Sequence, residues 1–192
     1  LSDISDGMLR DARRALGARD SRFSFATFDC EKIPAASESY DLVIANHVLF
    51  YCDNLENVCK EVRRVLKPGG TFMIVNESDG TYGNSHMKEI SQLVSRFDER
   101  IVLSANKLYE KFGRENGAHV LEPWFSRVEW ISYEDGLLVS DPEPLISYIL
   151  SCHGNQNQYL LDHYKEFRSF VKKKTEKGLH ITKDAGIFIC NY

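Results

Sequence analysis

Three consecutive segments decide the fold: DLVIANHVL at residues 41–49, NLENVCKEVRRVL at 54–66 and TFMIVNE at 71–77. The first and last are apolar runs of strand length, which suit strands buried on both faces of a sheet. The middle segment repeats its apolar residues at helical spacing, and Pro68 with Gly69 ends that helix. Two strands joined by a helix form a parallel β–α–β unit, so the sequence predicts an α/β fold.

Regular patterns continue on both sides of this unit. Towards the N-terminus, DGMLRDARRALG at 6–17 predicts a helix capped by Asp6, and RFSFATF at 22–28 alternates like a half-buried strand. Towards the C-terminus the patterns predict helices at about 86–98, 105–117, 142–152 and 156–177, a strand and turn at 128–139, and a closing strand at 181–190.

Composition narrows the class of protein. The formal net charge of −4 argues against a nucleic-acid binder held by phosphate contacts. Apolar runs fall short of the ~20 residues that a membrane span needs. The cysteine count is odd and no Cys-x-x-Cys occurs, so we expect free thiols, no metal site and a cytoplasmic protein.

Several motifs together resemble the Rossmann-like (class I) S-adenosylmethionine-dependent methyltransferases. They are DISDGML at 3–9, the strand-end Asp29, the strand DLVIANHVL and the turn KPGG at 67–70. The match covers about residues 1–80 by motif, and the chain is most similar to the small-molecule subgroup that includes the ubiquinone and menaquinone C-methyltransferases. The resemblance implies a doubly wound, mostly parallel sheet with strand order 3-2-1-4-5-7-6, an antiparallel seventh strand, and S-adenosylmethionine as cofactor.

The resemblance assigns cofactor contacts to residues at the first strand ends. Asp3 is expected to bind the ribose hydroxyls, because two acceptor oxygens suit a vicinal diol. The alternative is that Asp3 or Asp6 only caps the following helix. Asp29 is expected to accept a hydrogen bond from the adenine amino group, with the N–H of Cys30 facing a ring nitrogen. The alternative for Asp29 is a solvated aspartate in a turn.

Other candidates line the rest of the expected site. Met8 and Ile33 are expected to supply apolar faces for the purine, although each suits the core equally well. Asn46 and His47 end the strand beside which the family places the methionine part and the sulfonium. His47 is the candidate catalytic base, with a packing histidine as the alternative. Tyr51 is expected to line the pocket, since an aromatic face attracts a cation.

The sequence gives weaker evidence for the residues of the substrate pocket. Tyr82, His86 and His153 are candidates for the substrate pocket, Glu77 is a further rim candidate, and each also fits a surface role. Segments 79–127 and 142–177 follow strands whose carboxyl ends form the ligand rim. We therefore expect a helical cap at these two segments, within one domain of residues 1–192.

The Gly-rich turn that opens the family's domain has no counterpart in this sequence. We therefore expect a sheet that is incomplete at its N-terminal side, without the strand that lies mid-sheet in the family. Two explanations stay open: the sequence is the retained part of a longer chain, or a homo-oligomer fills the gap by exchanging elements, since open strand edges favour association. For the same reason we expect the chain by itself to bind cofactor weakly and to be inactive.

The leading hypothesis is an enzyme that transfers a methyl group from S-adenosylmethionine to an O, N or C nucleophile of a small molecule. Such catalysis rests largely on alignment of the reacting groups. The alternative is a non-catalytic, methyltransferase-like protein that acts by assembly with a partner. A third, weaker hypothesis is a Rossmann protein that binds NAD or a nucleotide sugar, which the KPGG turn disfavours.

Overall fold

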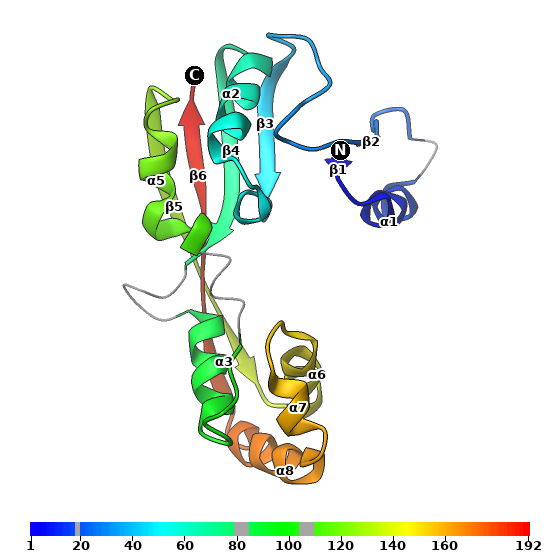
Figure 1. The fold of residues 1–192 in the computed structure, drawn as a ribbon, viewed down its shortest axis with the longest axis vertical. Helices are drawn as coiled ribbons and strands as arrows, with labels where there is room; N and C mark the ends of the chain where they lie inside the picture. The colour runs from blue at the N-terminus through cyan, green and yellow to red at the C-terminus, as the bar shows by residue number, and fades with distance from the viewer. Residues whose placement is uncertain (18–19, 79–84, 104–109) are drawn as a thin grey trace.

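The computed structural model describes residues 1–17, 20–78, 85–103 and 110–192. Its central feature is a four-stranded sheet with the order β3-β4-β6-β5. The strands are β3 (Tyr40–Asn46), β4 (Leu66–Glu77), β5 (Arg127–Val139) and β6 (Leu179–Asn191). Strands β3 and β4 are parallel, and β6 runs antiparallel to both β4 and β5 (Figure 1).

The predicted β–α–β unit is confirmed. Helix α2 (Leu55–Val65) connects β3 to β4, and the side chain of Asn54 caps it by accepting from the N–H of Asn57. Strand β3 ends at Asn46 rather than at residue 49, because His47 adopts a left-handed φ of 52° and a 3₁₀ turn, η1 (Leu49–Tyr51), follows. The KPGG turn lies within the bounds of β4, where Gly69 takes a φ of 78°.

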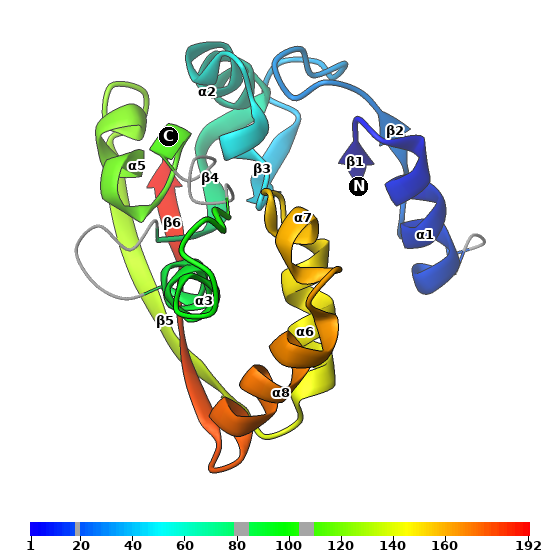
Figure 2. The ribbon, with the colours of Figure 1, turned by 60° about the horizontal axis from the view of Figure 1, so that its bottom comes forward.

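The N-terminal unit consists of β1 (Ser2–Asp3), α1 (Asp6–Leu16) and β2 (Ala26–Thr27). Its two short strands pair in parallel as a separate sheet, and Figures 1 and 2 both show the unit set apart from the four-stranded sheet. The strand predicted at 22–28 is thus much shorter. Ser5, not Asp6, caps α1 by accepting from the N–H of Met8, while Asp6 accepts from the hydroxyl of Thr27.

One face of the four-stranded sheet carries the main core. Helices α2 and α5 (Arg114–Leu121) supply apolar side chains to that core. Its fully buried members from the sheet are Leu66, Phe72, Ile74, Phe188 and Cys190. The opposite face is less covered, since Leu42 and Ile44 of β3 are 45% and 52% exposed.

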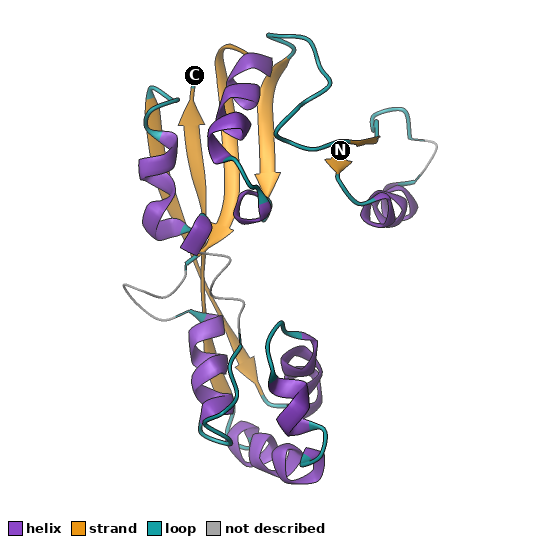
Figure 3. Ribbon diagram, in the orientation of Figure 1, coloured by secondary structure: helices purple, strands orange, loops and turns teal. Residues whose placement is uncertain are grey.

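A helical cluster packs around the far half of the β5–β6 ladder (Figure 3). It comprises α3 (His86–Ser95), α6 (Pro142–Ser151), α7 (Gln156–Leu160) and α8 (Tyr164–Thr175). The helix predicted at 156–177 is therefore two helices, and 128–139 is one continuous strand instead of a strand and turn. Helix α5, although it falls within segment 79–127, packs on the sheet and not in the cluster. None of the described helices is long and apolar enough to cross a membrane.

Candidate functional site

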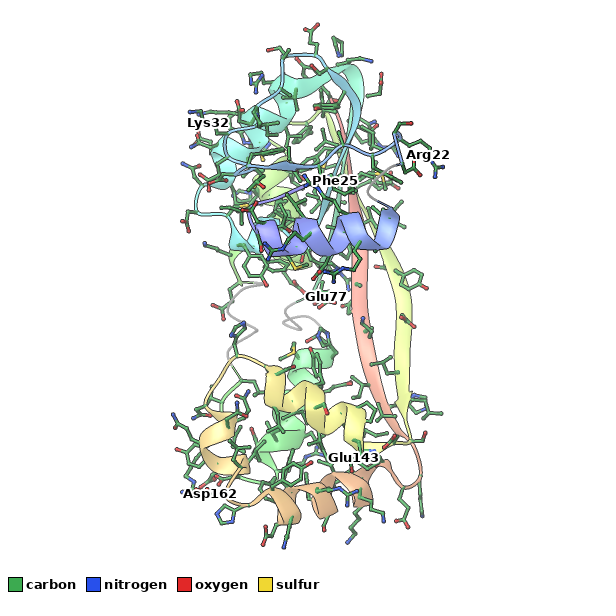
Figure 4. The ribbon with its side chains drawn as sticks, turned by 90° about the vertical axis from the view of Figure 1, so that its right-hand side faces the viewer. Arg22, Phe25, Lys32, Glu77, Glu143 and Asp162 are labelled. Carbon is green, nitrogen blue, oxygen red and sulfur yellow. The ribbon has the colours of Figure 1, made fainter. Side chains whose placement is uncertain are left out.

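The candidate site begins at the carboxyl ends of β3 and β4. These strands are parallel, so their ends meet at one edge of the sheet, where α/β proteins bind ligands. Asn46 pairs with Val75 of β4, and the N–H of His47 donates to the Val75 carbonyl at 3.0 Å. Glu77, the last residue of β4, lies at the same edge and faces the helical cluster (Figure 4).

A histidine–carboxylate pair occupies this edge. Ser85 caps α3, which makes His86 the first residue of the helix, and His86 Nδ1 lies 3.5 Å from Glu77 Oε2. Both side chains are only 13% exposed. Burial lowers the pKa of His86 below its ordinary value of 6.5; the Glu77 carboxylate opposes this shift, and the positive charge of Lys183 adds to it. The imidazole is therefore neutral at neutral pH.

Tyr148 joins this pair from the helical cluster. Its ring centroid lies 6.4 Å from that of His86, and its hydroxyl donates to the sulfur of Met87 at 3.3 Å. Burial raises the pKa of Tyr148 to about 12, so the phenol stays protonated. The sequence does not mark Tyr148, because nothing in the pattern of α6 indicates which residue of a distant helix it contacts.

The proposed cofactor end lies at the N-terminal unit. Asp3 ends β1, and its Oδ1 accepts from the N–H of Ser5 at 2.8 Å. Asp29 lies two residues beyond β2, and its Oδ1 accepts from the N–H of Glu31 at 2.9 Å. The second oxygen of each carboxylate has no hydrogen-bond partner within the described ranges.

This donor set fits an adenosine group. Hydroxyls and an exocyclic amine need acceptors, which Asp3 and Asp29 offer, and a ring nitrogen needs a donor, which the N–H of Cys30 offers. The two aspartates are brought to one side of the unit, because β1 and β2 are parallel and pair Asp3 with Thr27.

The remaining cofactor candidates differ in their surroundings. Ile33 packs against the sheet core, its N–H donates to Glu61 Oε2 at 2.8 Å, and its carbonyl accepts from Arg64 Nη2 at 2.8 Å. These bonds hold the loop after Asp29 against α2. Met8, in contrast, is 60% exposed on α1.

The substrate-side candidates are not all brought together. Tyr51 is 63% exposed, and its ring centroid lies 4.5 Å from that of buried Phe50. His153 is an exposed residue between α6 and α7, and no contact joins it to His86 within the part that the structure describes. Tyr82 lies outside the described residues. The described side chains also hold no group of three or more His, Cys, Asp or Glu placed to bind a metal ion.

Comparison with known sequences relates the first part of the chain to a known family. Residues 1–74 match the sequence model of a family described as "Methyltransferase domain". The malonyl-[acyl-carrier protein] O-methyltransferase of Enterobacter lignolyticus is 33% identical over 98 residues, which are 51% of this chain and 36% of that protein. A hybrid PKS-NRPS synthetase of Penicillium oxalicum is 37% identical over 78 residues, 38% of this chain and 2% of that protein. The chain thus spans only a minor part of these relatives.

Solved structures extend the likeness to nearly the whole chain. A candidate methyltransferase from Bacillus halodurans superposes with a TM-score of 0.62 at 15% identity, covering 99% of this chain and 80% of that one. A phosphoethanolamine N-methyltransferase of Haemonchus contortus gives a TM-score of 0.53 at 18% identity, covering 99% and 42%. Residues 1–74 therefore match a methyltransferase-domain model, and the whole chain has the α/β fold of the Rossmann-like methyltransferases.

Proposed function

We propose that the protein is an S-adenosylmethionine-dependent methyltransferase that acts on a small molecule. The observation that carries the proposal is the half-buried His86–Glu77 pair at the carboxyl edge of β3 and β4, in a chain whose first 74 residues match a methyltransferase domain. The Haemonchus enzyme is described in complex with S-adenosylhomocysteine and phosphomonomethylethanolamine, which supports both the cofactor and the substrate class.

The cofactor supplies a methyl group on a sulfonium, and the N-terminal unit with the end of β3 would hold it. Asp3 would bind the ribose hydroxyls, Asp29 the adenine amine and the Cys30 N–H a ring nitrogen. Asn46 would face the methionine part. Ile33 would contribute little to the purine face, since it is engaged with the core, and Met8 is the more accessible apolar candidate.

His86 is the residue that we assign to proton transfer. With its Nδ1–H directed to Glu77, the neutral imidazole presents the lone pair of Nε2 as a proton acceptor. Glu77 is a positioning residue, because it holds the ring and stabilises the imidazolium that forms. His47 remains the alternative base; it is exposed at the end of β3 and less constrained than His86.

The helical cluster would form the substrate side of the site. Helix α3 supplies His86, and α6 supplies Tyr148 beside it. Replacing segment 142–177 by that of a homologue should change which substrate is methylated and leave cofactor affinity nearly constant. A loss of cofactor affinity with unchanged substrate choice would contradict this assignment.

The decisive experiment compares three histidines. In a longer parent protein that carries the family's Gly-rich turn, His86→Gln should lower kcat by about 10²–10⁴-fold, the usual contribution of a general base, and leave the dissociation constant of S-adenosylhomocysteine unchanged. His47→Gln tests the alternative base, and His119→Gln, at an exposed position on α5, is the matched control. Methyl transfer from labelled S-adenosylmethionine to a panel of phenols, amines and activated carbon acids provides the readout. Equal activity of the His86→Gln and His119→Gln variants would remove His86 from the mechanism.

A non-catalytic role in assembly is the second candidate function. The exposed Leu42 and Ile44 on the sheet face favour it, and they also support a homo-oligomer. Light scattering and titration with S-adenosylhomocysteine separate the two roles. An associated protein that binds no S-adenosylhomocysteine would favour the assembly role. We place the protein in the cytoplasm, a reducing compartment in which disulfides form only transiently.

A further inference from the structure

Two cysteines from separate segments meet beside the proposed cofactor loop. Cys30 follows Asp29, Cys52 follows the turn η1, and their sulfur atoms are 3.3 Å apart. The neighbouring backbone holds the segments together, because Glu31 Oε1 accepts from the N–H groups of Asp53 at 2.9 Å and Asn54 at 2.8 Å. The contact is therefore part of a fixed junction between this loop and the start of α2.

The environment makes the two thiols unequal. Cys52 is 7% exposed, whereas Cys30 is half-buried and nearer to solvent. The hydrogen bond from Cys52 lowers the pKa of Cys30, although burial and the carboxylates of Asp29 and Glu31 oppose the shift. The same hydrogen bond, together with burial, raises the pKa of Cys52. Cys30 is thus the thiol that ionises first and meets an oxidant first.

The other three cysteines differ from this pair in their burial and their contacts. Cys59 and Cys190 are fully buried, and burial raises their pKa values to about 11 and about 12. Cys152 lies in the helical cluster, where its thiol donates to the Tyr148 carbonyl at 3.3 Å. They serve as internal controls for any chemistry at the close pair.

We propose that Cys30 and Cys52 are a covalent modification site, at which a hydroperoxide closes a reversible disulfide between the cofactor loop and the start of α2. The Cys30 thiolate attacks the peroxide, so that the O–O bond breaks, Cys30 becomes a sulfenic acid and the leaving oxygen departs as alcohol or water. The Cys52 sulfur then attacks the Cys30 sulfur, an S–S bond forms and water leaves with the Cys52 proton. A dithiol reductant reverses the change.

The disulfide would act on the proposed cofactor site. A disulfide bond is about 2.05 Å long, so the two sulfurs must approach by roughly 1 Å from their present separation. Cys30 belongs to the loop whose Asp29 carboxylate and Cys30 N–H we assign to adenine, and this consequence rests on that proposed function. Drawing the loop towards α2 displaces those groups relative to Asp3, which weakens the binding of adenosine.

Peptide mapping of the full chain tests the covalent step. The protein is treated with hydrogen peroxide, its remaining thiols are alkylated, and its peptides are analysed with and without dithiothreitol. We expect a peptide linked through Cys30 and Cys52, cleaved by dithiothreitol, with the other three cysteines alkylated. Cys30→Ser should abolish the link and Cys152→Ser should preserve it. The proposal would be overturned if Cys30 of the treated wild-type protein were not linked to Cys52 but were found alkylated or oxidised to a sulfinic acid.

Titration with S-adenosylhomocysteine tests the coupling separately. The oxidised protein should bind at least about fivefold more weakly than the reduced protein, which is the scale of losing one hydrogen bond, and dithiothreitol should restore the affinity. A complete disulfide with unchanged affinity would overturn the coupling to the site. If the reduced protein already fails to bind, the proposed function fails, while the peptide map still decides whether the pair reacts.

Discussion

The two ends of the candidate site are supported very differently. Glu77 ends a strand that pairs along its length with β3 on one side and β6 on the other. Asp3 ends a strand whose ladder consists of two residue pairs, Ser2 with Ala26 and Asp3 with Thr27. The catalytic end is therefore built on a sheet with a large core, and the cofactor end on an isolated strand pair, which is marginal by itself.

The difference shows that a residue in a well-matched sequence motif need not lie in a well-packed part of the structure. Asp3 and Asp29 belong to the best-matching part of the sequence, yet Leu9 is the only buried residue of α1, the helix that joins their strands. His86 belongs to no motif, yet it is half-buried and paired. Binding at the proposed cofactor end would therefore order a weakly held unit, whereas the proposed catalytic end is held in place beforehand.

The largest expected difference between the two regions is in stability. Phe188→Ala removes a fully buried ring that packs against Phe112 and Trp130, and should lower the free energy of unfolding by about 3–5 kcal/mol. Phe25→Ala removes a half-buried ring of the N-terminal unit (Figure 4), over which the Arg13 guanidinium carbon lies 5.2 Å from the centroid, and should cost about 1 kcal/mol. Urea denaturation measures both. Equal losses would mean that the two regions are equally well packed.

An intermediate effect is expected on cofactor affinity. Asp29→Ala should weaken the binding of S-adenosylhomocysteine by about 1.5–3 kcal/mol, the usual contribution of a hydrogen bond to a charged group. Asp11→Ala is the matched control, because Asp11 is an exposed carboxylate of α1 that pairs only with Arg14 among the described residues. Isothermal titration calorimetry compares the two variants. An unchanged affinity in Asp29→Ala would exclude Asp29 from the site.

The smallest expected effect is a shift in pH dependence at the catalytic end. Because burial lowers the pKa of His86, the base stays active down to a pH below 6.5, and kcat/KM should fall only as the pH drops through that lowered pKa. Glu77→Gln removes the carboxylate that raises this pKa, so the acid limb should move to still lower pH. If the acid limb of the kcat/KM profile moved to higher pH in Glu77→Gln, or were still present in His86→Gln, a titrating group other than His86 would cause it.

The same pKa shift links pH to folding stability. The folded-state pKa of His86 lies below its unfolded value, so the neutral form is favoured in the native state. Its contribution is fully present above pH 6.5 and is lost as the pH falls from there through the folded-state pKa. Comparing urea midpoints of wild type and His86→Gln across this range isolates the contribution, and parallel pH profiles would contradict it.

Much of the architecture followed from local sequence patterns. The β3–α2–β4 unit, α1 and the closing strand β6 were each predicted within a few residues, because apolar periodicity and capping residues act over one or two turns. The strand at 22–28 and the helix at 156–177 were overestimated for the same reason. Local patterns indicate which secondary structure a segment favours, whereas the length of a short strand depends on the strand with which it pairs.

By itself, the sequence determined the fold class, the order of the elements and the candidate residues at strand ends, since these follow from periodicity and parallel-strand geometry. The tertiary structure alone decided which side chains meet. Tyr148 contacts Met87 across 61 positions, and Cys30 contacts Cys52 across 22. Such contacts depend on how helices and loops pack after the chain has turned, so burial, pairing and the resulting pKa shifts emerge only when distant segments exclude water together.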